Sequence, residues 1–141
     1  MSDITDLYSE IITEHNKKPR NFRTMDGATQ TYDAYNPLCG DRYMLYFKVE
    51  NNVIADVSFE GVGCAISKAS ASIMTTMVKG RTVDGAVVLF EKFHNFILGK
   101  LENTEGLERL SAFSGVSKFP ARVKCATLPW HGMKTALETS N

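Results

Sequence analysis

The chain has 141 residues, the size of one domain with a single hydrophobic core, and we expect one domain over residues 1–141. Hydrophobic residues make up 43% of the chain and charged residues 23%, as in ordinary globular proteins, and sixteen basic residues balance sixteen acidic ones. With this balance, the chain has no net charge that would attract it to a nucleic acid or a membrane surface. No apolar run approaches the roughly 20 residues that a membrane-spanning helix needs.

The first predicted element is an amphipathic helix that ends at Pro19. Apolar residues recur there at the spacing of one helix face, at Ile4, Leu7, Tyr8, Ile11 and Ile12. Residues 20–41 have no sustained period, and we interpret them as a long connection of a kind that is usually functional or disordered. The basic stretch "KKPRNFR" at this point is either a docking patch or a solvated helix end.

A β-hairpin is predicted next. Residues 42–49 and 53–60 are rich in β-branched and aromatic side chains and flank the turn "ENN". The second run alternates apolar and polar residues with the period of a half-buried strand. Because an isolated hairpin is only marginally stable, we expect a third strand, and "GATQTYDAY" at residues 27–35 is the best candidate for it.

Helical patterns follow the hairpin over residues 67–80, 82–99 and 119–138, with a shorter apolar stripe in residues 105–113. Ser67 is predicted to cap the first of these helices, and Pro129 either breaks the last one or opens its final segment. A sheet followed by helices predicts an α+β fold, in which a small antiparallel sheet of about three strands carries helices on one face.

Three cysteines, Cys39, Cys64 and Cys125, lie where loops or element ends are predicted. An odd count excludes a complete disulfide framework, and the acidic N-terminus has no secretory pattern, so we expect a reducing, cytoplasmic location. In an antiparallel hairpin, the start of the first strand and the end of the second share one edge of the sheet. Cys39 and Cys64 are therefore predicted neighbours, and Cys125 can join them if the last helix crosses that edge.

Asp41 makes this arrangement look like a metal site. Three thiolates and a carboxylate would form a tetrahedral set for zinc, with Cys39, Asp41, Cys64 and Cys125 as ligands. His131 is an alternative ligand, because imidazole commonly binds metals. The other alternative is that the cysteines are only small buried hydrophobic residues, but the glycines and bases beside them favour reactive thiolates.

Four segments of the chain, taken together, resemble the IscU/SufU family of iron–sulfur cluster assembly proteins. They are "HNKKPRNF", "NPLCGD", "GVGCAISKASASIM" and "RVKCATLPW". The resemblance implies the α+β fold called SufE/IscU-like, and its motif cysteines and aspartate match the four expected ligands. It also implies that the protein receives sulfur from a pyridoxal-phosphate cysteine desulfurase and takes part in building iron–sulfur clusters, with zinc often in the same site.

Three features resemble the SufU type more than the IscU type. Lys124 stands where IscU-type proteins have a histidine, their proline-rich segment is replaced by "SKFPARVKC", and a helical insertion around "GRTVDGAVVLFEKF" lengthens the interval between Cys64 and Cys125. The resemblance then implies a zinc-dependent sulfurtransferase-like protein that takes persulfide sulfur from a SufS-type desulfurase. The alternative is a scaffold that assembles a [2Fe–2S] cluster on iron and passes it to acceptor proteins.

Cys39 is the expected sulfur acceptor, because it lies on the long connection while the other two cysteines are anchored at predicted helix starts. A metal-bound thiol stays deprotonated, but its cysteine must leave the metal before it attacks. Arg122 is expected to steer the persulfide or stabilise its charge. Besides the desulfurase, we expect a downstream cluster scaffold or acceptor protein as a partner.

Overall fold

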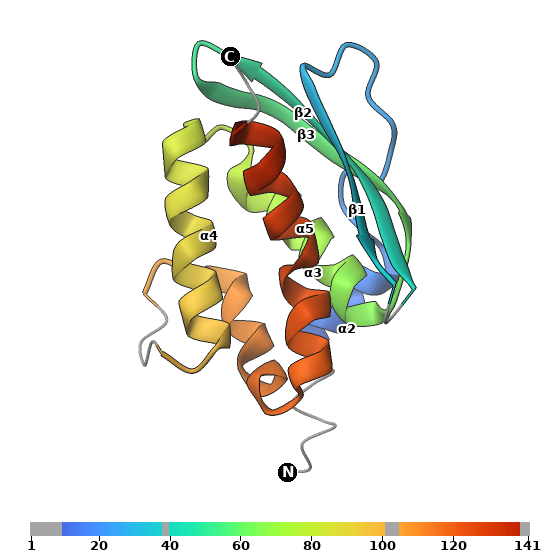
Figure 1. Ribbon diagram of the computed structural model, residues 1–141, viewed down its shortest axis with the longest axis vertical. Helices are drawn as coiled ribbons and strands as arrows, with labels where there is room; N and C mark the ends of the chain where they lie inside the picture. Colours follow the sequence, from blue (N-terminus) through green and yellow to red (C-terminus); the bar gives the residue numbers. More distant parts are fainter. Residues whose placement is uncertain (1–9, 38–39, 101–104, 139–141) are drawn as a thin grey trace.

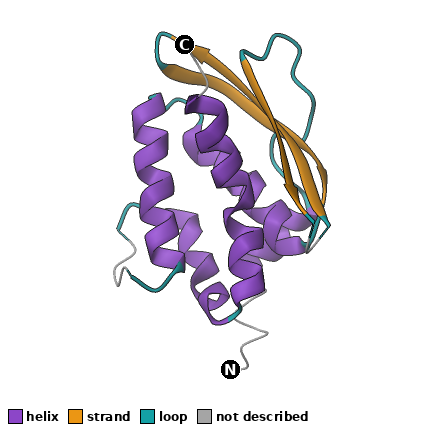
Figure 2. Ribbon diagram, in the orientation of Figure 1, coloured by secondary structure: helices purple, strands orange, loops and turns teal. Residues whose placement is uncertain are grey.

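The computed structural model describes residues 10–37, 40–100 and 105–138, and these form a twisted sheet with helices packed on one of its faces (Figures 1 and 2). The strands are antiparallel and lie in the order β1 (Gln30–Asn36), β2 (Asp41–Glu50) and β3 (Val53–Val62). The helical elements are α2 (Glu10–Lys17), α3 (Ala65–Val78), α4 (Val83–Ile97), the 3-10 helix η1 (Glu108–Lys118) and α5 (Pro120–Glu138). The predicted α+β fold is confirmed, and β1 lies where the third strand was expected.

Within these described ranges, no helix combines the length and the apolar character that crossing a membrane requires.

Buried and more exposed residues alternate along β2, and the buried ones form part of the inner face of the sheet. Tyr43, Leu45 and Phe47 are fully buried, while the residues between them are more exposed. Leu45 lies opposite Phe59 of β3, so large apolar side chains of two strands share this face. The core therefore lies between the sheet and the helices, chiefly α3 and α5.

α5 packs against the sheet through Gly132. A Cβ atom at this position would lie 2.7 Å from Leu45 Cδ1 and 3.1 Å from a ring carbon of Tyr32, so a larger residue would push the helix away. The helix continues through Pro129, and the expectation that this proline breaks it or opens a new segment is wrong. Proline makes no backbone N–H hydrogen bond within the helix, and the turns that follow it, including Trp130, are largely buried.

The stripe in residues 105–113 extends into η1. Buried residues recur at every third position, at Leu107, Leu110, Phe113 and Val116, which is the period of a 3-10 helix. In the part of the first predicted helix that is described, α2 buries Ile12 and His15 but leaves Ile11 37% exposed. The earlier apolar residues of that pattern lie outside the described ranges.

Candidate metal centre

Asp41, Cys64 and Cys125 come together at the end of the sheet where β2 begins and β3 ends. Asp41 is the first residue of β2, Cys64 follows β3 at the start of α3, and Cys125 lies in the second turn of α5. Antiparallel pairing of Arg42 with Val62 brings the two strand ends side by side. One ligand atom from each of the three residues lies within 4.8 Å of the others. The structure thus brings three of the four predicted ligands to one point.

Cys39 lies outside the described residues, so its place among the ligands stays a prediction. On either side of it, the Gly40 N–H donates to the Asn36 carbonyl at 2.9 Å, and Asn36 pairs with Asp41 across the two strands. Pro37 and Gly40 are both exposed. The described residues that flank Cys39 therefore adjoin Asp41 and face solvent.

The Asp41 carboxylate is fully buried and only half satisfied. Its Oδ1 accepts the Cys64 N–H at 2.8 Å, whereas Oδ2 has no hydrogen-bond partner. Among the described residues, Ser58 Oγ is the other buried side-chain nitrogen or oxygen that has no hydrogen-bond partner. An unpartnered buried polar atom costs roughly 1–3 kcal/mol, and more when it is charged. A cation at this point would satisfy Oδ2, and two sulfurs with one carboxylate oxygen suit zinc, so the residues fit such a metal.

Cys64, and not Ser67, caps α3, so the predicted cap is wrong. Cys64 has extended backbone angles, and its Sγ accepts the Ser67 N–H at 3.4 Å. The pKa of Cys64 is lowered by a hydrogen bond with Cys125 and further by the backbone N–H and hydroxyl of Ser67, while burial acts against them. These donors, at the positive end of a helix, favour the thiolate that binds metals.

Tyr43 and Ser67 form a buried pair beside Cys64, and neither was predicted to belong to the site. Their hydroxyl oxygens are 2.8 Å apart, and both residues are fully buried. Gly63 leaves room for them, because a Cβ there would collide with the Tyr43 hydroxyl and lie 2.7 Å from both Asp41 Oδ1 and Ser67 Oγ. The sequence spacing could have placed both residues at the site. Tyr43 lies two residues from Asp41 on a strand, so the two side chains share a face, and Ser67 lies three residues from Cys64, the spacing of a helix cap.

The remaining predicted residues lie on α5. Cys125 is fully buried, and Arg122, one turn earlier on the same helix, is partly exposed. Lys124, which stands where IscU-type proteins have a histidine, is exposed. The role expected for Arg122 toward a persulfide stays a prediction.

His131 lies apart from this group. Its ring packs 4.9 Å from that of Phe90 and 5.3 Å from that of His94, centre to centre, beside a hollow of about 380 Å³. Burial lowers the pKa of His131. In the described part of the chain, the one group of three or more clustered metal-ligand side chains is Asp41, Cys64 and Cys125, and it contains no histidine. The geometry therefore favours these three over His131.

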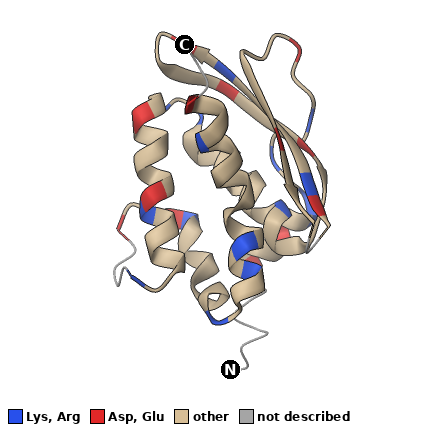
Figure 3. Ribbon diagram, in the orientation of Figure 1, with Lys and Arg blue, Asp and Glu red and all other residues tan. Residues whose placement is uncertain are grey.

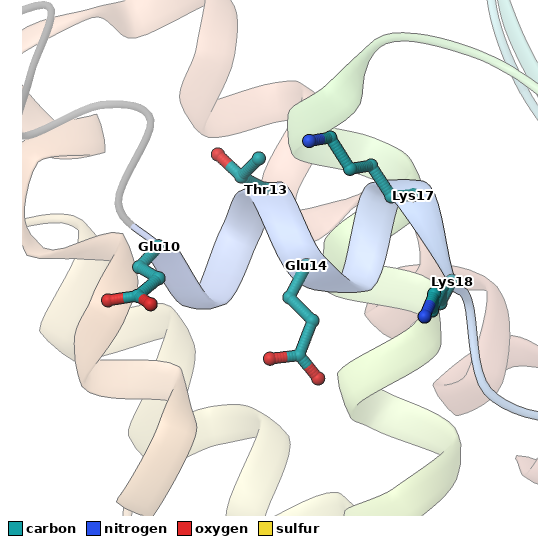
Figure 4. Close-up of a pocket in the computed structure, with 5 residues that line it drawn as sticks. All are labelled: Glu10, Thr13, Glu14, Lys17 and Lys18. Atoms are coloured by element: carbon teal, nitrogen blue, oxygen red, sulfur yellow. The ribbon is translucent and has the colours of Figure 1, made fainter.

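Two of the four basic residues in the segment "KKPRNFR" pair with acidic residues. Arg20 pairs with Glu14, and Arg23 donates to both carboxylate oxygens of Asp56 at 2.9 and 3.0 Å. Acidic and basic side chains also surround a shallow hollow on α2, which is lined by Glu10, Thr13, Glu14, Lys17 and Lys18 (Figure 4). Both signs of charge are spread over the sheet and the helices (Figure 3). These exposed pairs are compatible with both a solvated helix end and a docking patch.

Comparison with known proteins gives consistent matches over most of the chain. The family described as NifU-like N terminal domain matches residues 7–126. The zinc-dependent sulfurtransferase SufU of Bacillus subtilis is 40% identical over 134 residues, which cover 94% of this chain and 90% of that protein. The iron–sulfur cluster assembly scaffold protein IscU of Streptococcus pyogenes is 36% identical, over 99% of this chain and 88% of that protein.

A solved structure shows the same fold. It is the crystal structure of a candidate iron–sulfur cluster assembly scaffold protein for the SUF system from Fervidobacterium islandicum. The two structures superpose with a TM-score of 0.89 at 35% sequence identity, covering 94% of this chain and 98% of that one.

Proposed function

The chain belongs to the family of NifU-like N-terminal domains, and from that premise we propose that it serves iron–sulfur cluster assembly as a zinc-dependent sulfur acceptor for a cysteine desulfurase of the SufS type. The observation that carries the proposal is the cluster of Asp41, Cys64 and Cys125, in which a buried carboxylate oxygen has no protein partner. The similarity to a relative named as a zinc-dependent sulfurtransferase supports the same function. The proposal places the protein in the cytoplasm, where thiols stay reduced.

In this proposal Cys39, Asp41, Cys64 and Cys125 hold the zinc. When bound, zinc keeps its cysteine ligands deprotonated at neutral pH. Asp41 is held for this role by the Cys64 N–H, which binds Oδ1, while Oδ2 has no hydrogen-bond partner. Cys125 is shielded from water by the core around it.

Cys39 is the proposed acceptor. Burial excludes Cys125 from a partner, and Cys64 is bound into the cap of α3, whereas the residues that flank Cys39 are exposed. The Cys39 thiolate attacks the terminal sulfur of the desulfurase persulfide, a bond forms between the two sulfurs, and the S–S bond of the donor breaks. The desulfurase cysteine leaves as a thiolate and the proton stays on the transferred sulfur, so the step needs no oxidant. Arg122 would steer the persulfide and stabilise the negative charge of the thiolate that leaves.

The decisive experiment is trapping of the persulfide. The zinc-loaded protein is incubated with desulfurase and cysteine, and mass spectrometry locates the added sulfur. We expect it on Cys39, and we expect Cys39→Ser to abolish it, because a serine hydroxyl stays protonated without an adjacent base. Sulfur on Cys64 or Cys125, with Cys39 bare, would contradict the assignment. Desulfurase turnover should also rise with the zinc-loaded protein and not with the zinc-free protein.

The second candidate function is a scaffold for a [2Fe–2S] cluster, which would then pass to acceptor proteins. It is favoured by the relative named as an IscU scaffold, and the same thiolates suit iron. Metal content after aerobic purification separates the two functions. A colourless protein with one zinc per chain supports sulfur transfer, and a brown protein with iron and sulfide supports the scaffold.

A further inference from the structure

The face of the sheet that carries no helix among the described residues has a hollow near the metal centre (Figure 2). The hollow measures about 310 Å³ and is lined by Asp33, Arg42, Met44, Glu60, Gly61 and Val62. Strand side chains alternate between faces, so the exposed Arg42 lies on the face opposite its buried neighbour Asp41. The hollow and the metal centre therefore share one end of the sheet and lie on its two faces.

A row of exposed side chains crosses the sheet at this end. Tyr35 of β1, Arg42 of β2 and Val62 of β3 lie opposite one another in the strand pairing. Val62 is 70% exposed, Tyr35 is 56% exposed, and the Arg42 guanidinium lies over the Tyr35 ring, 5.5 Å from its centre. Aromatic residues, methionine and arginine are enriched in protein interfaces, and Met44 lines the hollow beside this row. The row and the hollow together have the composition of a docking surface.

The hollow carries an excess of negative charge. Arg42 donates to both carboxylate oxygens of Asp33, at 2.6 and 3.1 Å, so these two charges compensate each other. Glu60 accepts a hydrogen bond from the Tyr46 hydroxyl, and none of the ion pairs among the described residues includes Glu60. A lysine or arginine side chain of a partner would complement this lining, with its charged group near Glu60 and its methylene groups against Met44.

The position of Cys39 in the chain indicates which partner covers this surface. Asn36 and Asp41 are paired across β1 and β2, and Cys39 lies between them in sequence, so the segment that carries it starts and ends at this end of the sheet. Attack on a persulfide requires the donor protein to bring its sulfur to bonding distance from Cys39. A donor that does so adjoins the exposed row. A second copy of this chain fits less well, because in a symmetric pair the acidic hollow would face its own copy.

We propose that the cysteine desulfurase docks on this row and inserts a lysine or arginine side chain into the hollow beside Glu60. This inference rests on the proposed function and adds the side of the molecule from which the sulfur donor approaches. Tyr35 and Val62 supply apolar contact area, and Glu60 fixes the register, because complementary charges determine how two surfaces align.

The test measures the affinity of the zinc-loaded protein for the purified desulfurase by calorimetry. We expect Glu60→Lys and Val62→Lys each to weaken binding at least about tenfold, because both place a cation against the incoming basic side chain and Val62→Lys also removes an apolar contact. Glu60→Gln should weaken binding less and make the affinity less dependent on ionic strength. If Val62→Lys loses zinc, Glu60→Lys decides the question. An unchanged affinity in Glu60→Lys overturns the inference.

Val88→Lys and Glu91→Lys are the matched controls. Val88 is 63% exposed and Glu91 is exposed, and both lie on α4 in the helical layer on the other side of the sheet. They change the net charge by the same amounts as the two test variants, so the affinity should stay unchanged. An equal loss in the controls would mean a general effect of charge and would overturn the inference. So would a change in self-association, measured by sedimentation, with desulfurase affinity unaltered.

The persulfide on Cys39 separates this inference from the proposed function. With saturating desulfurase and cysteine, we expect it in the unmodified protein and also in Glu60→Lys and Val62→Lys, because neither residue takes part in the transfer step. Absence of the persulfide in the unmodified protein overturns the proposed function, whatever the affinities. A normal persulfide with an unchanged affinity in Glu60→Lys overturns only the docking surface.

Discussion

Helix α3 takes part in two buried polar clusters, one at its N-terminus and one along its middle. The site cluster consists of Asp41, Tyr43, Cys64, Ser67 and Cys125. The packing cluster consists of His15, Ser70, Ser72 and Trp130. Both lie against the same helix and both are largely withdrawn from water, so their surroundings are comparable.

The packing cluster is closed by its own hydrogen bonds. Ser72 Oγ is 2.7 Å from His15 Nδ1 and accepts the Arg20 N–H at 2.8 Å. Ser70 Oγ donates to the Ala126 carbonyl and accepts the Trp130 Nε1–H at 3.1 Å. These bonds hold α2 and α5 against α3, and full pairing of buried polar groups is what a structural cluster requires.

The site cluster is not closed, because Asp41 Oδ2 is left without a partner next to two thiols. The difference teaches that buried polarity alone does not mark a functional site in this protein. The candidate metal site is set apart by an unpartnered carboxylate oxygen beside two cysteine thiols. Metal removal and substitutions in the site cluster should therefore act through zinc binding. Substitutions in the packing cluster should lower the free energy of unfolding and leave zinc binding unchanged.

Removing zinc should have the largest effect. If zinc is present at about 1,000 times its dissociation constant, its removal lowers the free energy of unfolding by about 4 kcal/mol. Cys64→Ser and Cys125→Ser should behave like the chelated protein, because each removes a ligand. Thermal unfolding with and without a chelator measures this. Identical transitions, with full zinc content in both variants, would show that the site cluster binds no metal.

Asp41→Asn should separate metal binding from folding. We expect zinc affinity to fall by at least about 100-fold, beyond what changes outside the ligand set cost. The free energy of unfolding of the metal-free protein should change by only about 1 kcal/mol, since the substitution removes a buried charge with an unpartnered oxygen. Competition with a chelator and urea unfolding give the two quantities. A large loss of metal-free stability with unchanged zinc affinity would make Asp41 a structural residue.

Ser70→Ala tests the packing cluster. It leaves the Trp130 N–H without its acceptor, and we expect the free energy of unfolding to fall by about 1–3 kcal/mol. Zinc stoichiometry should stay at one per chain in the folded protein. Denaturant unfolding and metal analysis of the same preparation check both expectations, and loss of zinc at full stability would contradict the separation of the two clusters.

The smallest expected effect is a dependence on pH that comes from His15. Burial lowers the pKa of His15 in the folded protein, and Arg20 and Arg109 lower it further, against a small opposing effect of Glu14. The unfolded chain keeps a value of about 6.5, so below that pH it binds more protons than the folded chain. Stability due to neutral His15 is therefore complete above pH 6.5 and is lost as the pH falls toward the lower folded pKa.

His15→Gln should flatten this part of the stability profile. Urea unfolding of the zinc-free protein at several pH values below 7 measures the slope. His131, whose pKa is also lowered by burial, stays in both proteins and serves as a common background. Equal slopes in the variant and the unmodified protein would show that His15 does not titrate differently on folding.

Local sequence patterns were enough to predict the main elements and their order along the chain. Alternation in residues 53–60 predicted a half-buried strand, and antiparallel pairing then required the start of β2 and the end of β3 to share an edge, which brings Asp41 near Cys64. These are consequences of local periods and of chain direction, both of which can be deduced from sequence. The presence of a third strand followed from the instability of a lone hairpin.

The completion of the site depends on how distant segments pack, which local patterns do not predict. Cys125 reaches the sheet edge because α5 packs closely through Gly132 and continues past Pro129, and neither property follows from local periodicity. The bond from Tyr43 to Ser67 and the unpartnered oxygen of Asp41 depend on side chains of three elements meeting in the core. Periodicity assigns a residue to a face, but the atoms that it meets there are set by the packing of segments distant in sequence.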